Sequence, residues 1–303
     1  MTRVVFVLTP QVHLLDLAGP AQVFTTAEGY EVGYVAEASP VPTWQGVSLN
    51  APADWPALTP RDLVLVPGWR DGYGAFAAGT LSRIAGHHAA GGTVASVCAG
   101  ADALGRAGLL DGRRCTTHHD LQDRLARTYP KATVVRDVLY VSDDRVVTSA
   151  GIASGIDLAL HLVAQHRGAA AAARAAREMV VYGRRNGDEP QDSAMLRHRA
   201  HLSDVVHRVQ DRIDAAFASP LPLATLAAAA GVSERTLTRL FTSATGRTPL
   251  RYQQLLRVER AEYLIGHGAT VESAARAVGF ADARMLRRLR ARLVLPSVVR
   301  RVM

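Results

Sequence analysis

LAAAAGVSERTLTRL at residues 226–240 and AARAVGFADARMLRRL at residues 274–289 are two copies of one pattern. Each copy has a short apolar segment, a glycine, and then leucines three residues apart, which predicts two helices joined by a tight turn. A helix-turn-helix unit has this plan, with a small residue four positions before the glycine where the helices cross. Because Gly231 and Gly279 are 48 positions apart, the sequence predicts two such units in an all-α domain.

The first unit is expected to present a recognition helix over residues 234–243, for which Ser233 is a favourable N-cap. Arg235, Thr236 and Arg239 would face outward near its start, where bases or phosphates are reached. An arginine can bind guanine through two hydrogen bonds, whereas a phosphate contact positions the protein without reading sequence. The sequence leaves both roles open for these arginines.

The second unit has a denser set of arginines on its predicted recognition helix, residues 283–293, which favours phosphate binding over sequence reading. A predicted helix over residues 249–267 joins the units and would be roughly 28 Å long, comparable with one DNA turn of about 34 Å. The residues that we expect at the DNA are Ser233, Arg235, Thr236, Arg239 and Arg247 in the first unit, and Arg284, Arg287, Arg288 and Arg290 in the second.

The charge of the chain is concentrated in the same region. Residues 203–303 contain 16 arginines and 8 acidic residues, whereas residues 1–202 contain 19 residues of each sign, so the net charge of +8 belongs to the last third. A basic region beside a neutral one is typical of a nucleic-acid-binding module, although a solvated basic surface is the simpler alternative. Two cysteines do not make a disulfide framework, and no apolar run approaches the roughly 20 residues of a membrane span. We therefore expect a cytoplasmic protein that does not enter a membrane.

The first part of the chain alternates strands and helices. Short apolar runs such as residues 4–8 and 63–66 are typical of strands buried on both faces of a sheet, and helical segments lie between them. This order predicts a flavodoxin-like, doubly wound parallel α/β sandwich. The most linker-like stretch is the polar segment 183–192. We expect an α/β domain over residues 1–182, a linker over residues 183–202 and the DNA-binding domain over residues 203–303.

A cysteine follows one predicted strand, at the sharp turn between residues 93–97 and the next helix. A thiol at a helix N-terminus is favoured as thiolate, and small neighbours suit such a crowded turn. Asp16, Gly68, Cys98 and His118 would gather at the carboxyl edge of the sheet, where such folds bind ligands. Taken singly, Cys98 is more simply a buried structural thiol and His118 a capping or core histidine, so catalytic roles for Cys98, Asp16 and His118 remain candidates only.

The C-terminal residues resemble the AraC/XylS transcription regulators. The resemblance rests on the sequence SERTLTRLF at residues 233–241, on Gly246 and Pro249, and on Gly279-Phe280. After Phe280 the chain departs from the family pattern, because Leu289-Arg290 and Val294-Leu295-Pro296 replace the usual phenylalanine and Gly-x-x-Pro. The resemblance thus implies a sequence-reading first unit and a second unit that mainly binds phosphate.

Residues 3–183 resemble the ThiJ/PfpI superfamily, and the order of the two parts resembles the GlxA-type regulators. The matching segments are LDLAGP at 15–20, VPG at 66–68, SVCAG at 96–100, GLLDGR at 108–113, Thr117-His118 and TSAG at 148–151. Protease-like members have a histidine after the cysteine, where Ala99 stands here, and Trp69 replaces a usual glycine. The resemblance implies a domain that dimerises and binds a small effector, with Asp16, Gly68, Trp69, Cys98, Ala99 and His118 lining the pocket.

The sequence therefore predicts a transcription regulator that binds double-stranded DNA, is controlled by a small effector and forms a homodimer through its first domain. We expect no enzymatic activity, no cofactor and no metal. The alternative is a cysteine-dependent hydratase or hydrolase in which Cys98 is the nucleophile and Asp16 acts as base. Redox sensing by Cys98 is a third hypothesis.

Overall fold

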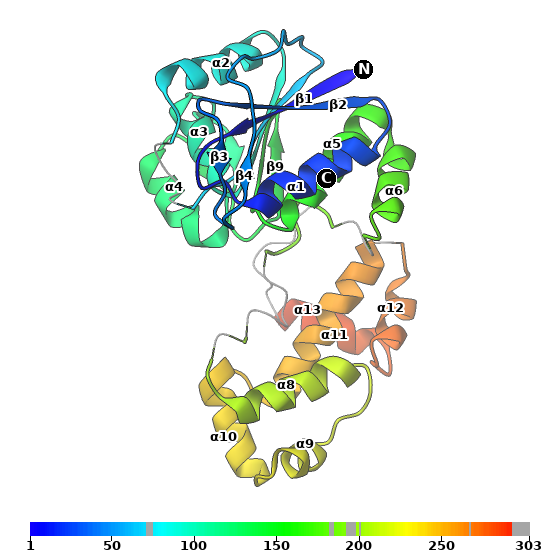
Figure 1. Cartoon of the computed structure of the whole chain (residues 1–303). Helices are drawn as coiled ribbons and strands as arrows, with labels where there is room; N and C mark the ends of the chain where they lie inside the picture. Colours follow the sequence, from blue (N-terminus) through cyan, green and yellow to red (C-terminus); the bar gives the residue numbers. More distant parts are fainter. Residues whose placement is uncertain (71–74, 182–184, 192–197, 200, 267, 293–303) are drawn as a thin grey trace. The chain divides into compact units, whose positions relative to one another are not determined.

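The computed structural model of the chain describes residues 1–70, 75–181, 185–191, 198–199, 201–266 and 268–292 (Figure 1). The chain divides into two compact structural units, of which the first is Met1–Gln191 and the second is Asp192–Met303. The two helix-turn-helix repeats expected from the sequence both lie in the second structural unit and are called pairs. In the described part of the chain, no helix combines the length and the apolar composition needed to cross a bilayer.

The first unit is built on a six-stranded sheet in the order β2-β1-β5-β6-β10-β9. The first five strands of this order are parallel, as the sequence predicts, whereas β9 runs antiparallel to β10. A two-residue turn at Asp144-Arg145 joins β9 to β10, and so short a connection can link only antiparallel neighbours. The strands of the sheet are β1 Thr2–Leu8, β2 Tyr30–Ala36, β5 Leu63–Val66, β6 Thr93–Val97, β9 Tyr140–Asp143 and β10 Val146–Ser149.

Helices cover both faces of this sheet, as Figure 1 shows. Alternate strand residues supply the two cores: Val4 and Phe6 of β1 face one way, and Val5 and Val7 face the other. The first face packs against α1 Leu14–Thr26, α5 Ser154–Arg167 and α6 Ala169–Glu178. The second packs against α2 Ala78–Ala89, α3 Ala101–Arg106 and α4 Gln122–Thr128. The predicted doubly wound sandwich is thereby confirmed.

Short elements complete this unit. They are two 3₁₀ turns, η1 Cys98–Gly100 and η2 His119–Leu121, and two small ladders, β3 Val41–Pro42 with β4 Ser48–Leu49 and β7 Arg114–Cys115 with β8 Thr133–Val134.

Residues 185–191 belong to the α/β unit, although the sequence predicts them to be part of a linker. The Arg185 guanidinium binds the Asp157 carboxylate, and the Leu139 amide donates to the Gly187 carbonyl (2.8 Å). Gln191 Nε2 donates to the carbonyls of Thr117 (2.9 Å) and Val138 (3.0 Å). These tertiary hydrogen bonds could not be read from a polar, turn-rich sequence. Residues 183–184, 192–197 and 200 of the predicted linker lie outside the described residues.

The second unit is all α, with two helix-turn-helix pairs joined by one long helix. Its helices are α8 Asp204–Ala216, α9 Leu223–Ala230, α10 Glu234–Thr245, α11 Pro249–Gly266, α12 Val271–Ala277 and α13 Ala283–Arg292. Side chains cap five of them, because oxygens of Ser203, Ser233, Thr248, Thr270 and Asp282 accept hydrogen bonds from amides in the first turns of α8, α10, α11, α12 and α13. One apolar core surrounds the α9–α10 pair and another the α12–α13 pair, and α11 contributes to both. The predicted tandem architecture is confirmed, while the residues from 293 onward lie outside the described part.

We predict that Arg185→Ala destabilises the first unit by about 1–3 kcal/mol. The Asp157 side chain is 4% exposed and would keep a buried carboxylate without its cation, but Arg185 is 37% exposed, so the cost falls below the 3–5 kcal/mol of a fully buried pair. Urea unfolding followed by tryptophan fluorescence measures this, because Trp44, Trp55 and Trp69 all lie in the first unit. Lys131→Ala, which breaks the exposed pair with Asp111, is the control and should cost less than about 1 kcal/mol. An equally small effect of Arg185→Ala would contradict the anchoring role of residues 185–191.

Candidate functional site

Cys98 lies at a strained turn where β6 ends and η1 begins. Its φ is +55°, a left-handed conformation that is rare for a residue with a side chain and is common at functional sites. Neighbouring main chain comes very close, because a Cβ added at Gly151 would lie 2.4 Å from Cys98 Cβ. The sharp turn that the sequence predicts around Cys98 is therefore present, at the carboxyl edge of the sheet.

Three of the four residues expected at this edge, Asp16, Gly68 and Cys98, come together there, and Ala99 lies beside them. A Cβ at Gly68 would lie 2.4 Å from Asp16 Oδ2, 2.8 Å from Cys98 Cβ and 3.0 Å from the Ala99 amide nitrogen. The Asp16 side chain enters from α1 and is fully buried. Asp16 Oδ1 accepts a hydrogen bond from the Ile152 amide (2.6 Å), whereas Oδ2 has no hydrogen-bond partner within the described residues. The site therefore contains a carboxylate oxygen that is available to a donor.

The electrostatics of this site oppose a thiolate. Burial raises the pKa of the Cys98 thiol far above its ordinary value, the nearby charge of Asp16 raises it further, and the Ala99 amide lowers it by a smaller amount. Burial also raises the pKa of Asp16, against the hydrogen bond from Ile152. This balance opposes the expectation that the helix N-terminus favours thiolate at Cys98, because burial and the charge of Asp16 outweigh the hydrogen bond from the Ala99 amide. The thiol is protonated at neutral pH.

His118 is held by its neighbours in sequence. Its Nδ1 accepts the Asp120 amide (3.4 Å) and lies 3.6 Å from Asp120 Oδ2, and its ring lies 4.1 Å from that of His119. The preceding residue, Thr117, contacts the turn at Cys98, because Thr117 Oγ1 donates a hydrogen bond to the Cys98 carbonyl (2.7 Å). His118, His119 and Asp120 could together hold a metal ion, since their ligand atoms lie within 4.8 Å of one another, but two of the three residues are exposed. The absence of a metal stays a prediction.

Trp69 does not share the core cluster that contains Cys98 and Ala99. Its side chain is 3% exposed and belongs to the core on the opposite face of the sheet. There its ring meets Phe76 edge-on, with centroids 5.4 Å apart. The sequence placed Trp69 in the effector pocket by resemblance; the indole is buried against Phe76, and a role in binding an effector stays a prediction.

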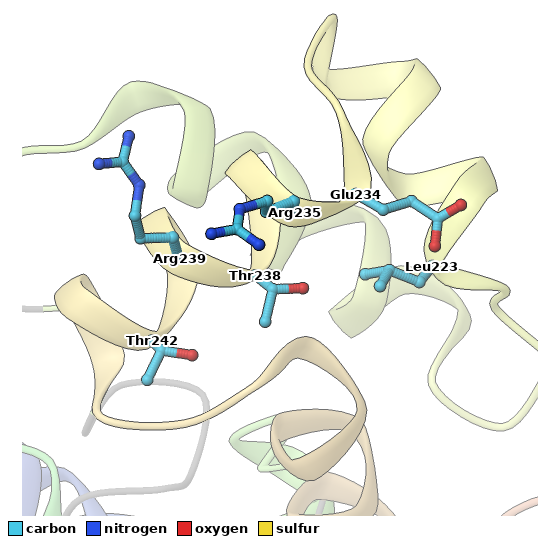
Figure 2. Close-up of a pocket in the computed structure, with 6 residues that line it drawn as sticks. All are labelled: Leu223, Glu234, Arg235, Thr238, Arg239 and Thr242. Carbon is cyan, nitrogen blue, oxygen red and sulfur yellow. The ribbon is translucent and has the colours of Figure 1, made fainter.

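One face of α10 forms a shallow hollow at the surface of the second unit (Figure 2). Arg235, Thr238, Arg239 and Thr242 line it at spacings of three and four residues, together with Glu234 and with Leu223 of α9. Both arginines are exposed. The sequence prediction included the two arginines but not the two threonines, although the i, i+3, i+4, i+7 spacing places all four on one face of a helix.

Ser233 and Thr236 are hydrogen-bonded to each other at the start of α10. Ser233 Oγ accepts the Thr236 amide (3.2 Å) and donates to Thr236 Oγ1 (2.9 Å). Arg247 is half-buried, and its main chain closes the end of the same helix with Thr245 Oγ1. These contacts stabilise the recognition helix, and direct roles of the three residues at DNA remain predictions.

The arginines of α13 are partly neutralised within their own unit. Arg287 pairs with Glu272 of α12 (2.7 Å), and Arg290 pairs with Glu262 of α11. Arg284 and Arg288 are exposed on α13. The α12–α13 pair thus presents less unpaired positive charge than its arginine content suggests.

Comparison with known proteins identifies both parts of the chain. The DJ-1/PfpI family matches residues 2–165, and a helix-turn-helix domain matches residues 226–301. The chain belongs to the DJ-1/PfpI family and is a fusion of a domain of that family with an AraC-type helix-turn-helix domain.

Among the proteins similar to it are two curated relatives and one solved structure. The HTH-type transcriptional regulator GbdR of Pseudomonas aeruginosa is 30% identical over 175 residues, which cover 56% of this chain and 46% of GbdR, so the chain spans about half the length of that relative. The isonitrile hydratase of Pseudomonas putida is 37% identical over 163 residues, covering 52% of this chain and 68% of the hydratase. A ThiJ/PfpI family protein from Pseudomonas syringae superposes with a TM-score of 0.55 at 25% identity, over 71% of this chain and 86% of that one.

We predict that Cys98 in the native protein reacts with iodoacetamide at pH 7.5 more than about a hundredfold slower than a free thiol, because its raised pKa leaves little thiolate. The rate should keep rising well above pH 9. Asp16→Asn removes the negative charge that raises this pKa, so it should accelerate the reaction by about tenfold.

Peptide mass spectrometry follows both cysteines in the same sample, and Cys115 is the internal control. Burial, with a smaller effect of Asp143, raises the pKa of Cys115 to about 11, and Asp16 is not a cause of that shift. The Cys115 rate should therefore not respond to Asp16→Asn. A Cys98 rate that levels off near neutral pH would refute the protonated thiol.

Proposed function

We propose that this chain is a transcription regulator that binds double-stranded DNA through its second unit and a small effector through its first. The observation that carries the proposal is the joining, in one chain, of a DJ-1/PfpI domain to a helix-turn-helix domain with an exposed face of arginine and threonine on α10. The similarity to GbdR, a transcriptional regulator, supports the same assignment.

The α10 face offers the chemistry that reads a major groove. A helix fits that groove, arginine donates two hydrogen bonds to guanine, and the threonine methyl packs against the methyl group of thymine. Arg235 and Arg239 lie one turn apart and are free to reach base edges, and Thr238 and Thr242 continue the same face. We assign sequence reading to α10 and phosphate binding to the exposed arginines of α13.

The Asp16–Cys98 site supports ligand binding better than covalent chemistry. The thiol is protonated, Ala99 provides no proton donor or acceptor in its side chain, and Asp16 Oδ2 is buried without a hydrogen-bond partner among the described residues. We propose an effector that donates a hydrogen bond to Asp16. The resemblance to GlxA-type regulators also supports pairing of two copies through the first unit, which sedimentation velocity would measure as twice the chain mass of 32.4 kDa.

We expect Arg239→Ala to weaken binding to an operator, selected by the wild-type chain from random duplexes, by about 1–3 kcal/mol if Arg239 reads a base. Binding to random DNA should change little, because it depends on the total phosphate contact. Titrations monitored by fluorescence anisotropy at several salt concentrations give both affinities. Arg106→Ala is the control, since it removes the same charge from an exposed position of the first unit. Equal losses on both DNAs would assign Arg239 to phosphate, and a wild-type chain that selects no sequence would refute the regulator.

The second candidate function is hydration of an isonitrile, which the 37% identity to the hydratase favours. In that mechanism Cys98 is the nucleophile, so Cys98→Ser should abolish turnover of an isonitrile substrate while leaving DNA affinity unchanged. Product formation by the wild-type chain, followed by infrared loss of the isonitrile band, tests it. No turnover above that of Cys98→Ser would remove the hydratase and leave the regulator.

A further inference from the structure

The two helix-turn-helix pairs meet at a main-chain contact as well as through α11. The loop after α8, residues 217–222, reaches the turn between α12 and α13, where a Cβ added at Gly279 would lie 1.8 Å from the Ala218 carbonyl oxygen. Phe217, at the start of that loop, packs against the apolar cores of both pairs. The loop that leads into the first pair therefore lies directly on the turn of the second.

Arg257, near the middle of α11, bonds to both sides of this contact. Its Nε donates to the Phe217 carbonyl (2.6 Å) and its Nη2 to the Ser219 carbonyl (2.9 Å), both in the loop of the first pair. Its Nη1 donates to the Gly279 carbonyl (2.9 Å) in the turn of the second. Gln253, one helical turn earlier, donates to the same two loop carbonyls. One side chain thus ties both pairs to one point of the helix that connects them.

The shape of the guanidinium makes this contact directional. Its N–H groups lie in one plane at fixed angles, so three acceptors bonded to it cannot shift independently. All three acceptors are main-chain carbonyl oxygens, which move only when the loop or the turn moves. The ring of Phe280 lies beneath the guanidinium, 5.7 Å from centroid to Cζ. A rotation of the α12–α13 pair about α11 would break the bond to Gly279.

We propose that Arg257 is a positioning residue that holds the two helix-turn-helix pairs at one separation and phase, and so sets the spacing of the two DNA segments that they occupy together. The proposal rests on the DNA binding proposed above. Two recognition helices can enter successive major grooves only if they match the helical repeat of about 10–10.5 base pairs. With this anchor the protein would bind DNA segments at one spacing, whereas without it several spacings would be accepted.

The test compares the full-length chain with Arg257→Ala on an operator selected by the wild-type chain, after footprinting has located the two contacted segments. Inserting 5 base pairs between the segments should weaken wild-type binding more than about thirtyfold, because half a turn puts the second segment on the opposite face. Arg257→Ala should bind the parent operator about tenfold more weakly, and the insertion should change its affinity less than about threefold. A duplex with one segment scrambled should bind both proteins equally, which a general loss of folding would not produce. Arg257→Lys should be intermediate, since an ammonium lacks the planar fork.

Two glycine variants test the same contact without changing charge. Gly279→Ala places its Cβ against the Ala218 carbonyl, so the loop and the turn must separate and the spacing preference should be lost. Gly231→Ala is the matched control, because Gly231 occupies the equivalent turn of the first pair with a similar φ (+69° against +83°) and nothing within 4 Å of its Cβ. Gly231→Ala should bear the same backbone strain and keep the wild-type spacing preference.

Melting curves establish which variants fold. If Arg257→Ala does not fold, the spacing preferences of Arg257→Lys and Gly279→Ala decide whether Arg257 has the proposed role. A wild-type spacing profile in the folded variants would overturn the role of Arg257 and leave the regulator intact. Indifference of the wild-type chain to spacing would overturn it as well. Failure of the wild-type chain to select any sequence would instead remove the DNA-binding proposal and this one with it.

Discussion

The buried contact between the Asp16 carboxylate and the Cys98 segment determines what the first unit can do. A carboxylate taken from water must be compensated, and here Oδ1 is compensated by the Ile152 amide while Oδ2 faces the thiol side of the turn without a hydrogen-bond partner in the described residues. The close approach of residues 68 and 151 leaves no room for side chains that would open this contact to water. The same desolvation that leaves Asp16 in need of a donor keeps Cys98 protonated. This balance supports the proposed role of the site in ligand recognition.

The second unit depends on the contact that holds its two helix-turn-helix pairs together. Its two helix-turn-helix pairs are similar in sequence, but their turns have different surroundings. The turn at Gly231 is open, whereas the turn at Gly279 lies on the loop after α8 and is bonded to Arg257. The arginines also differ, because those of α10 line an exposed hollow and two of those of α13 pair with glutamates. The α9–α10 pair is the better candidate for reading sequence, and the α12–α13 pair is held in place relative to it.

Much of this architecture was predictable from local sequence. Strands buried on both faces appear as continuous apolar runs, so residues 4–8 and 63–66 indicated the sheet. Small residues, a capping serine and the glycines at the turns likewise indicated the helix-turn-helix pairs, and the predicted recognition helix over residues 234–243 lies within α10. Gathering of Asp16, Gly68 and Cys98 followed from the rule that the carboxyl ends of parallel strands meet at one edge.

The sequence by itself thus determined the elements, their order and the two families to which the parts belong, because these depend on periodicity and on residues close together in the chain. Tertiary structure alone decided the protonation of Cys98, the burial of Trp69 against Phe76 and the attachment of residues 185–191 to the α/β unit. It also decided which carbonyls Arg257 binds. Each of these depends on desolvation or on hydrogen bonds between segments distant in sequence, and neither quantity is encoded in the local pattern of residues.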